Sequence, residues 1–410
     1  MIKLYLILID IFLPISTGLL ITLILEHSPV SIYLIYSSIL VLFSYLKGFY
    51  DNYYSKHFSE KLRISFITTV IVIFFELIYH SFNGVDINSF IFLSWILIPI
   101  LILLLRYILL IINQSTNDVT ISIIGNLYKF SDHEIKILTD KRFKVYFYNE
   151  PNEYQKKVDS KSESYNLAVI NMTSESIQNN NFLSIMNTIS LGEFMENYLR
   201  KLYIDDKTVF ININKYNKSA YIYKRIIDYA AVIVLAPLLI LVSFYIIIMK
   251  LFKGHSGSFI YIQKRYGINQ NVFSLFKLRT MHIDSDKQGN TVKNDQRIYS
   301  FAKILRKFRL DELPQLINIL IGDMHLVGPR AEWVKLSDEY SKHIDNYGLR
   351  NIVRPGITGW AQVLYQYGFD INDSKQKLMY ELYYIKNWTI WLELEICIKT
   401  FAVILDKKGF

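Results

Sequence analysis

A chain of 410 residues has room for two or three domains, because a single hydrophobic core rarely grows beyond roughly 250–300 residues. Aliphatic and aromatic residues make up 52% of it, too many for an ordinary soluble enzyme, so part of the chain is expected to lie in lipid. The single cysteine, Cys397, excludes an internal disulfide framework, and the net charge of +9 suits nucleic acid, acidic lipid or a phosphorylated substrate without choosing between them.

The first 113 residues contain four apolar runs that we expect to cross a membrane. A helix that crosses a bilayer needs about 20 apolar residues, with a lower limit near 17. The second and third runs are close to that limit. The four runs cover residues 4–25, 30–46, 64–79 and 90–112.

The loops between these runs predict an orientation. Residues 26–29 and 81–89 contain no Lys or Arg, whereas the loop between the second and third runs carries Lys47, Lys56, Lys61 and Arg63. Because positive loops stay on the cytoplasmic side, both ends of the four-helix unit are expected in the cytoplasm. The acids Asp10 and Glu76 within the runs raise the alternative of a transport path, although acids near span ends more often face a helix partner or the interface.

Residues 117–214 predict a small α/β module. Four apolar, strand-like runs lie at 119–124, 143–148, 167–170 and 209–213. The polar stretch 181–201 between the last two is helix-capable. The first run ends at Gly125, where a dinucleotide-binding turn would read G-x-G-x-x-G, but residues 125–130 contain that one glycine only. A Rossmann-like fold without a working dinucleotide site is therefore expected.

Residues 229–252 form a fifth apolar run that is long enough to span. Basic residues flank it on both sides, at Lys224, Arg225, Lys250 and Lys253. This pattern favours both ends on the cytoplasmic face. Pro237 can break the helix and let it dip into the bilayer and return, so we favour a re-entrant membrane helix. A proline-kinked spanning helix is the alternative, since proline is tolerated in spans.

The adjacent acids Asp311 and Glu312 are the first candidates for chemistry. Neighbouring side chains on a helix point about 100° apart, but two carboxylates can converge on a metal ion if the helix starts there, and Pro314 is tolerated in a first turn. Carboxylates bind Mg²⁺ together with substrate phosphates, and a carboxylate can also attack phosphorus. Taken alone, such a pair more often only complements a helix dipole.

Four arginines lie beside these acids or in turns marked by glycine or proline: Arg279, Arg309, Arg330 and Arg354. Guanidinium groups suit phosphate oxygens and neutralise charge in phosphoryl transfer. Each arginine alone is typical of a surface position or a salt bridge. Their clustering with the acids favours a phosphate site.

Residues 221–410 resemble the bacterial sugar transferases, a family of polyprenyl-phosphate glycosyl-1-phosphate transferases. The resemblance rests on five segments in the family's order and spacing: KRIIDY, FKLRTM, RLDELPQLINIL, GDMHLVGPR and RPGITGWAQV. The N-terminal runs and the α/β module resemble the long form of that family. The implied fold is a membrane protein of mixed class, with a four-helix transmembrane bundle at 1–113, a Rossmann-like module at 117–214 and an α+β catalytic domain at 221–410 that includes the re-entrant helix 229–252.

The resemblance also implies a reaction and its residues. A sugar 1-phosphate would pass from a UDP-sugar to undecaprenyl phosphate with release of UMP, through a covalent aspartyl-phosphosugar, at the start of exopolysaccharide, capsule, O-antigen or glycan assembly. Asp311 would be the nucleophile, and Glu312 its partner in binding Mg²⁺ or handling protons. The implied substrate-binding residues are Lys277, Arg279, Arg309, Gln315, Arg330, Arg354 and Gln362.

The implied location is the bacterial plasma (inner) membrane, with a multi-pass topology and a cytoplasmic catalytic domain. The expected partners are a UDP-sugar, undecaprenyl phosphate and the bilayer, and a homodimer is compatible with this organisation. Nucleic acid is not expected as a partner, because the basic residues are scattered and lie beside membrane runs. The sugar, the pathway and the oligomeric state stay open in the sequence.

Some positions depart from the family pattern. Ala236 precedes Pro237 where serine is frequent, and Ala331 follows the Pro-Arg pair where proline is frequent. Glu381 and Glu393 stand where aspartate is common, and they keep the charge. None of these changes removes the acid pair.

The C-terminal stretch 388–405 mixes aromatic and aliphatic residues with Glu393, Glu395 and Lys399. A helix at the membrane interface fits this mixture better than a span. A buried core helix is the alternative.

Two other functions compete with the transferase. A membrane-bound nucleotide-sugar dehydratase also places an α/β domain after four spans, but it should have an intact glycine fingerprint. A transporter or polysaccharide-export scaffold leaves the acid pair and the GPR and RPGITGWAQV segments unexplained.

Overall fold

The computed structural model describes residues 6–16, 119–140, 143–159, 167–172, 188–204, 218–253, 258–282, 296–365 and 370–405, with isolated positions between 34 and 105 and at 213 and 368. Leu6–Ser16 is an apolar helix inside the first predicted span. Apart from isolated helical positions, the rest of the predicted four-span bundle lies outside the described residues. The chain divides into two compact units, residues 1–191 and 192–410, and the predicted module 117–214 straddles this division.

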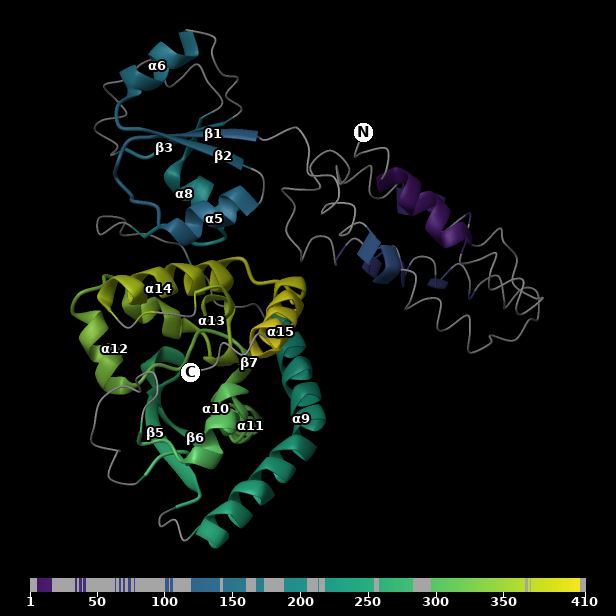
Figure 1. The fold of residues 1–410 in the computed structure, drawn as a ribbon, viewed down its shortest axis with the longest axis vertical. Helices are drawn as coiled ribbons and strands as arrows, with labels where there is room; N and C mark the ends of the chain where they lie inside the picture. The colour runs from purple at the N-terminus through teal and green to yellow at the C-terminus, as the bar shows by residue number, and fades with distance from the viewer. Residues whose placement is uncertain are drawn as a thin grey trace. The chain divides into compact units, whose positions relative to one another are not determined.

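The first unit contains a parallel four-stranded sheet with the order β2-β1-β3-β4. Its strands are β1 (Val119–Ile124), β2 (Phe143–Tyr148), β3 (Leu167–Ile170) and β4 (Thr188–Ser190). Helix α5 (Asp132–Asp140) follows β1, and α6 (Pro151–Asp159) follows β2 (Figure 1). The mixed α/β class and the first three predicted strands are confirmed.

The predicted fourth strand, at 209–213, lies outside the described residues except for position 213. The described sheet has β4 as its fourth strand, within the stretch that the sequence marked as helix-capable. Thr188 and Ile189 are β-branched, and they pair with Ala168 and Val169 of β3. These residues therefore form a strand through their pairing with β3, although the residues around them are polar.

The loop after β1 occupies the place where a dinucleotide-binding turn would lie. Gly125 has a positive φ of 102°, and a Cβ added there would lie 2.3 Å from the carbonyl oxygen of Asn171. The Asn171 side chain accepts a hydrogen bond from the Tyr128 backbone N–H and donates to the carbonyl oxygens of Gly125 and Tyr128. Asn171 thus holds the two ends of this loop together, and the loss of dinucleotide binding stays a prediction.

The second unit contains one long helix, α9 (Lys218–Lys253), with Pro237 inside it. Residues 219–249 of it have a mean hydropathy of 3.0 in their most apolar window, enough to cross a membrane by length and composition. At about 1.5 Å per residue, its 36 residues extend roughly 54 Å. Figure 1 shows α9 changing direction partway along, and an internal proline is the residue that typically kinks a helix.

The remaining elements fold against one face of α9. They comprise the antiparallel hairpin β5 (Ile260–Tyr266) and β6 (Val272–Leu278), the short parallel pair β7 (His325–Val327) and β8 (Gly356–Thr358), and helices α10 (Lys303–Lys307), α11 (Gln315–Ile321), α12 (Val334–Ser341), α13 (Trp360–Leu364), α14 (Ile371–Lys386) and α15 (Ile390–Leu405). Short 3₁₀ turns are η3 (Ile268–Gln270), η5 (Ser300–Ala302), η6 (Leu310–Glu312) and η7 (Tyr347–Ile352).

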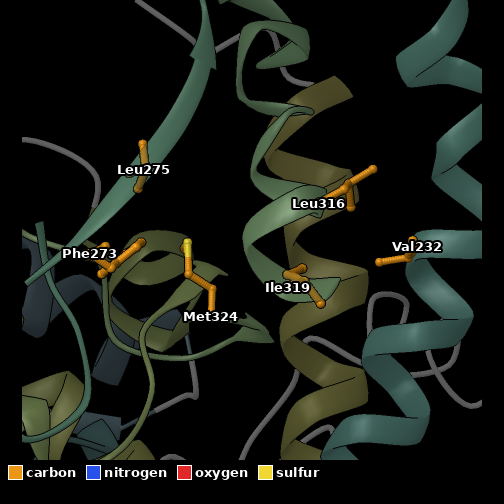
Figure 2. Packing of buried hydrophobic residues seen from close by; sticks show 7 residues of the cluster. Val232, Phe273, Leu275, Leu316, Ile319 and Met324 are labelled. Atoms are coloured by element: carbon orange, nitrogen blue, oxygen red, sulfur yellow. The ribbon is translucent and has the colours of Figure 1, made fainter. Parts of the chain in front are cut away.

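Two apolar clusters join α9 to this domain. The first contains Val232 of α9, Leu316 and Ile319 of α11, and Phe273 and Leu275 of β6. Figure 2 shows Val232 beside α11, with the two β6 side chains on the other side of that helix. In the second, Val242 and Ile246 of α9 pack with a set from β6 and the region around α10: Leu278, Tyr299, Phe301, Ala302 and Leu305. One side of α9, which includes Val232, Val242 and Ile246, is therefore part of the hydrophobic core of the domain.

The opposite stripe of α9 is exposed and apolar. Ile233, Val234 and Ile240 are 74%, 73% and 68% exposed, and Leu251 and Phe252 follow near the C-terminal end. Large apolar side chains of the domain are exposed as well, at Ile304, Ile317, Leu320, Ile321 and Phe401. Exposed apolar surface of this extent is typical of a membrane-facing protein.

Polar residues near the start of α9 lock it to the domain. Lys224 is fully buried and donates to the carboxylate of Glu393 (2.6 Å), the Tyr384 hydroxyl (2.7 Å) and the Val327 carbonyl oxygen (2.9 Å). Asp228 accepts from the Leu326 backbone N–H at 2.7 Å and contacts His325 Nδ1 at 2.6 Å. The KRIIDY segment thus fixes the helix to β7 and α15.

Candidate active site

The two candidate acids lie in the turn that leads into α11. Asp311 and Glu312 belong to the 3₁₀ turn η6, and Pro314 directly precedes the first residue of α11, as the first-turn placement predicted. Arg309 begins the turn in the left-handed region (φ 56°), and its carbonyl oxygen accepts from the Glu312 backbone N–H at 3.1 Å. This turn leaves Asp311 half-buried and Glu312 buried.

A lysine from the neighbouring strand faces the pair. Lys277 Nζ on β6 lies 3.0 Å from Glu312 Oε1. Asn318 of α11 sets this alignment, because its side chain accepts from the Phe276 backbone N–H at 3.1 Å and donates to the Ser274 carbonyl oxygen at 2.8 Å. One buried amide therefore joins the strand that carries the lysine to the helix that follows the acids.

The two carboxylates have opposite pKa shifts. For Asp311, burial and the charge of Glu312 raise the pKa to about 6. For Glu312, burial opposes ionisation, but Lys277, Arg330 and Arg309 outweigh it and hold the pKa well below its ordinary value. Burial lowers the pKa of Lys277, and Glu312 opposes that change. Neighbouring groups with separated pKa values are typical of a catalytic site.

Arg330 lies in a tight double turn made by the GPR and RPGITG segments. The Gly328 N–H donates to the Thr358 carbonyl oxygen at 2.9 Å, and the Gly356 N–H donates to the Pro329 carbonyl oxygen at 2.8 Å. A Cβ added to Gly356 would lie 2.1 Å from the Gly328 nitrogen. The spacing of these glycines thus reflects a backbone contact that leaves no room for side chains.

Buried charges behind this turn hold Arg330. Its backbone N–H donates to Glu381 Oε1 of α14 at 3.0 Å. Arg350 donates to the same carboxylate oxygen at 2.7 Å and to the Arg330 carbonyl oxygen at 2.9 Å. A second Glu381 oxygen, Oε2, is buried without a hydrogen-bond partner. The Arg330 backbone is therefore fixed from both sides of its peptide.

Arg265 is a basic residue of the site that the sequence did not single out. Its guanidinium donates to the Ala331 carbonyl oxygen at 3.1 Å and lies 3.5 Å from Glu332. Burial lowers the pKa of Arg265 to about 10, with Glu332 opposing the shift and Arg330 adding to it. Glu312 also acts on this group, which places Arg265 in the same electrostatic cluster as the acids.

The basic residues among the predicted substrate-binding residues form two groups, one around Glu312 and one in contact with tyrosine rings. Lys277, Arg309 and Arg330 surround Glu312 with positive charge. Arg279 lies over the Tyr261 ring (5.3 Å to its centre), and Arg354 lies over the ring of Tyr221 on α9 (5.1 Å) and donates to its hydroxyl. The contacts described for Arg279 and Arg354 are therefore with tyrosine rings.

The two predicted glutamines are buried or partly buried within the domain. Gln315 starts α11 and is 3% exposed. Gln362 donates to the Ile357 carbonyl oxygen at 3.0 Å, and its own Oε1 is buried without a hydrogen-bond partner. Gln362 therefore has one polar atom that the described residues leave unsatisfied.

From the sequence alone, no role was assigned to Arg350, Glu381 or Arg265. Arg350 and Glu381 are buried charges, and Glu381 lies in the run Leu378–Ile385, which is buried throughout. Buried charges are retained only where they are paired, so a charge inside such an apolar and aromatic run is a signal for Glu381. Arg265 follows Gln263 and Lys264 on strand β5, and this polar stretch does not distinguish it from an exposed arginine.

The described residues contain no group of three or more His, Cys, Asp or Glu that could hold a metal ion by themselves. Asp311 and Glu312 provide two carboxylates, one of whose oxygens Lys277 occupies. Such a donor set fits Mg²⁺ only when substrate phosphates complete the coordination.

Comparison with known proteins connects this geometry to a family. The family described as bacterial sugar transferase matches residues 219–407. An uncharacterized sugar transferase of Bacillus subtilis (strain 168) is 34% identical over 189 residues, which cover 46% of this chain and 90% of that protein.

Two longer relatives have assigned activities in their names. A UDP-N-acetylgalactosamine-undecaprenyl-phosphate N-acetylgalactosaminephosphotransferase of Aeromonas hydrophila is 38% identical over 191 residues, 45% of this chain and 44% of that protein. A UDP-glucose:undecaprenyl-phosphate glucose-1-phosphate transferase of Xanthomonas campestris pv. campestris is 39% identical over 161 residues, 37% of this chain and 32% of that protein. The chain therefore spans less than half of the length of these two relatives, and the likeness lies in its C-terminal part.

Proposed function

The chain belongs to the bacterial sugar transferase family, and on that basis we propose that it moves a sugar 1-phosphate from a UDP-sugar to undecaprenyl phosphate and releases UMP. The names of the Aeromonas and Xanthomonas relatives support both the donor and the acceptor. The product, a lipid-linked sugar diphosphate, suits the first step of exopolysaccharide, capsule, O-antigen or glycan assembly.

One observation carries the proposal. Asp311 and Glu312 stand next to each other with opposite pKa shifts, and Lys277, Arg309 and Arg330 act on Glu312. At neutral pH, Asp311 is mostly ionised in poorly solvated surroundings, which suits a nucleophile. The basic groups suit a diphosphate, whose charge increases on the leaving group as the reaction proceeds.

The reaction runs in two displacements. A carboxylate oxygen of Asp311 attacks the β-phosphorus of the UDP-sugar, an O–P bond forms, and the bond from that phosphorus to the bridging oxygen breaks with its electron pair on UMP. A phosphate oxygen of undecaprenyl phosphate then attacks the same phosphorus. The aspartyl O–P bond breaks, and the Asp311 carboxylate is restored.

Basic residues position the diphosphate during these steps. Lys277 keeps Glu312 ionised and oriented, and its charge extends to Asp311 as well. Arg330 and Arg309 supply charge beside the same carboxylates, and a guanidinium can bind two phosphate oxygens at once. Arg265 supports Arg330 through the carbonyl oxygen of the next residue, Ala331.

Asp311 and Glu312 would also hold a Mg²⁺ ion together with the phosphates of the donor. Bound there, the ion would neutralise charge on the diphosphate and favour departure of UMP. Lys277 would keep one oxygen of Glu312, so that the rest of the carboxylate pair faces the substrate.

The packing of α9 supports the membrane placement that we propose. One side of α9, from Val232 to Ile246, packs on the catalytic domain, whose proposed substrate, a UDP-sugar, is cytoplasmic. If α9 crossed the bilayer over this length, the core of that domain would have to lie in lipid. A helix that enters the bilayer and returns keeps the domain at the head groups, with the exposed apolar stripe in lipid. We therefore retain the re-entrant helix and the cytoplasmic catalytic domain in a multi-pass inner-membrane protein.

The test measures UMP release by the purified full chain in detergent with Mg²⁺, undecaprenyl phosphate and a panel of UDP-sugars. Asp311→Asn is the inactive variant, and Asp345→Asn, an exposed aspartate of the same domain, is the matched control. We expect release with one or few sugars, lost in Asp311→Asn and kept in Asp345→Asn. Without the lipid, UMP should appear in a burst of about one per enzyme, with a phosphosugar on a peptide that contains Asp311. Full activity in Asp311→Asn would overturn the mechanism, and absence of UMP from every sugar would overturn the donor class.

A further inference from the structure

A short segment before α9, residues 192–204, belongs to the same compact unit as the candidate active site. We call it the docking segment. It contains the end of helix α8 (Leu191–Phe194), the π-helix η2 (Met195–Leu199) and an extended stretch from 200 to 204. It lies outside the family match, which begins at residue 219, and nothing in the reaction described above uses it.

The docking segment is largely buried, and part of it is hydrogen-bonded to α14. Phe194, Met195, Leu199, Lys201 and Ile204 are each at most 2% exposed. The Leu202 backbone N–H donates to the Met379 carbonyl oxygen at 2.9 Å, and Lys201 Nζ donates to Gln376 Oε1 at 2.8 Å. Gln376, Met379 and Tyr383 recur at helical spacing, so one face of α14 receives the segment.

The opposite face of α14 holds the active-site turn. Glu381 lies two residues after Met379, about 200° around the helix, and it accepts from the Arg330 backbone N–H and from Arg350. The helix thus stands between the docking segment and the turn that carries Arg330. A displacement of the docking segment can therefore reach the Arg330 turn by way of α14 only if the whole helix moves.

Arg200 provides a second and shorter connection. Its guanidinium forms a buried ion pair with both oxygens of Glu395 on α15 (2.8 and 2.9 Å) and lies 4.4 Å from the centre of the Trp360 ring. The indole N–H of Trp360 donates to the Arg200 carbonyl oxygen at 2.9 Å. Trp360 is 2% exposed, so Arg200 fixes it by its backbone and by its side chain.

Trp360 directly follows a glycine that touches the GPR turn. A Cβ added to Gly359 would lie 2.1 Å from the Gly328 carbonyl oxygen, and the Gly328 N–H donates to Thr358. Two residues after Gly328 is Arg330, whose charge acts on Glu312. Arg200, Trp360, the contact between Gly359 and Gly328, and Arg330 therefore follow one another through direct contacts or along the chain.

From this arrangement we propose that Arg200 is a positioning residue, which holds Trp360 and through it the GPR turn, so that Arg330 meets the diphosphate of the donor. The proposal rests on the proposed function for the identity of that substrate. A buried ion pair is weak evidence of stabilisation, because an apolar pair of similar size often serves a core equally well. Here the guanidinium of the pair also stacks on the Trp360 ring, and this contact fixes a geometry that an apolar pair would not reproduce. The indole N–H of Trp360 donates to the backbone carbonyl oxygen of Arg200, so a change of the side chain leaves that hydrogen bond in place.

The test compares the full chain with the double variant Arg200→Met/Glu395→Met, which leaves neither charge buried alone. The matched control is Glu196→Ala/Lys386→Ala, which removes a partly exposed ion pair (2.7 Å) between the same docking segment and α14. The thermal midpoint reports folding, and hydrogen–deuterium exchange reports residues 356–364 and 328–331. Kinetics give kcat/KM for the UDP-sugar and KM for undecaprenyl phosphate.

We expect the double variant to fold, to exchange faster in both peptides, and to lose about 10- to 100-fold in kcat/KM for the UDP-sugar, since a displacement near 1 Å has effects of that size. KM for undecaprenyl phosphate should stay unchanged, and the control should match the wild type. Arg200→Lys, which keeps the charge, should regain part of the lost activity.

Wild-type kinetics in a folded Arg200→Met/Glu395→Met variant, or unchanged exchange in both peptides, would overturn the positioning role. If the double variant fails to fold, Arg200→Lys decides by the same two readouts. Absence of UMP release by the wild type would instead overturn the proposed function, and the exchange measurement would still decide whether Arg200 orders the turn.

Discussion

Lys277 Nζ lies 3.0 Å from Glu312 Oε1, and the two side chains come from elements that Asn318 ties together. Burial lowers the pKa of Lys277. The positive charges around Glu312, with Lys277 the strongest, lower the pKa of Glu312. The lysine therefore sets the charge of Glu312, and the charge of Glu312 in turn raises the pKa of Asp311. Three groups share one electrostatic balance.

Replacing Lys277 by Met should remove this balance. Glu312 would lose the group that acts most strongly to keep it ionised, and we expect kcat/KM for the UDP-sugar to fall about 100-fold or more, as for other preorganised charges in active sites. The matched control is Lys264→Met, because Lys264 lies on the partner strand β5, is exposed, and bonds only to Ser274 in the contacts described. Equal activity of both variants in the UMP assay would contradict the role of Lys277.

Asn318 should matter for folding as well as for activity. Replacing it by Leu leaves the Phe276 N–H and the Ser274 carbonyl oxygen of β6 without their partner. Each unsatisfied buried group costs about 1–3 kcal/mol, so the thermal midpoint should fall by several degrees. Thermal unfolding in detergent measures this change, and Asn372→Leu, at an exposed position of helix α14, provides the comparison. A midpoint equal to that of the wild type would show that water replaces the amide without cost.

Gly359→Ala tests the contact between the two glycine-rich turns. The added Cβ would lie 2.1 Å from the Gly328 carbonyl oxygen, a backbone atom that cannot move without the GPR turn. Since the φ of Gly359 is extended, the effect is steric and not conformational. We expect activity to fall at least about 10-fold. Gly192→Ala, where a Cβ meets nothing within 4 Å, should retain activity.

The sequence predicted the acid pair because adjacent carboxylates, a first-turn proline and nearby arginines form a local pattern. It also predicted β1, β2 and β3, since each is a short apolar run between polar segments. Arg330 was found through its glycines and proline, which mark a backbone constraint that the structure confirms at Gly328 and Gly356.

Long-range pairing lies beyond such patterns. Arg265 and Glu381 reach the GPR turn from β5 and α14, and no spacing in the sequence brings those elements together. Asn318 stood in the RLDELPQLINIL segment, but its bonds to β6 depend on how a hairpin packs on a helix. For Arg354, the glycine- and proline-rich segment predicts phosphate binding, which stays a prediction, and its contact with Tyr221 of α9 is a further long-range pairing that the sequence did not indicate.

Lys201 gives the docking segment a pH dependence that stability measurements can detect. It is fully buried, and burial lowers its pKa from 10.5 to about 7. Between pH 7 and about 10 the unfolded chain therefore binds more protons at this residue than the folded chain, so stability rises with pH across that window by at most about 1.4 kcal/mol per pH unit. Below pH 7, Lys201 is charged in both the folded and the unfolded chain, and the buried charge lowers the free energy of unfolding by its full amount.

Lys201→Met should remove this slope. We expect the midpoint of the wild type to rise relative to that of the variant as pH increases from 7 to about 10. Loss of the Gln376 hydrogen bond lowers the variant's midpoint by the same amount at every pH, so it does not change this difference in slope. Lys386→Met changes a partly exposed lysine of α14 and should leave the wild-type slope in place. Differential scanning fluorimetry from pH 6.5 to 10 measures all three proteins. Identical slopes in wild type and Lys201→Met would mean that Lys201 reaches water in the folded protein, and the docking segment would then be less tightly packed on α14 than its burial indicates.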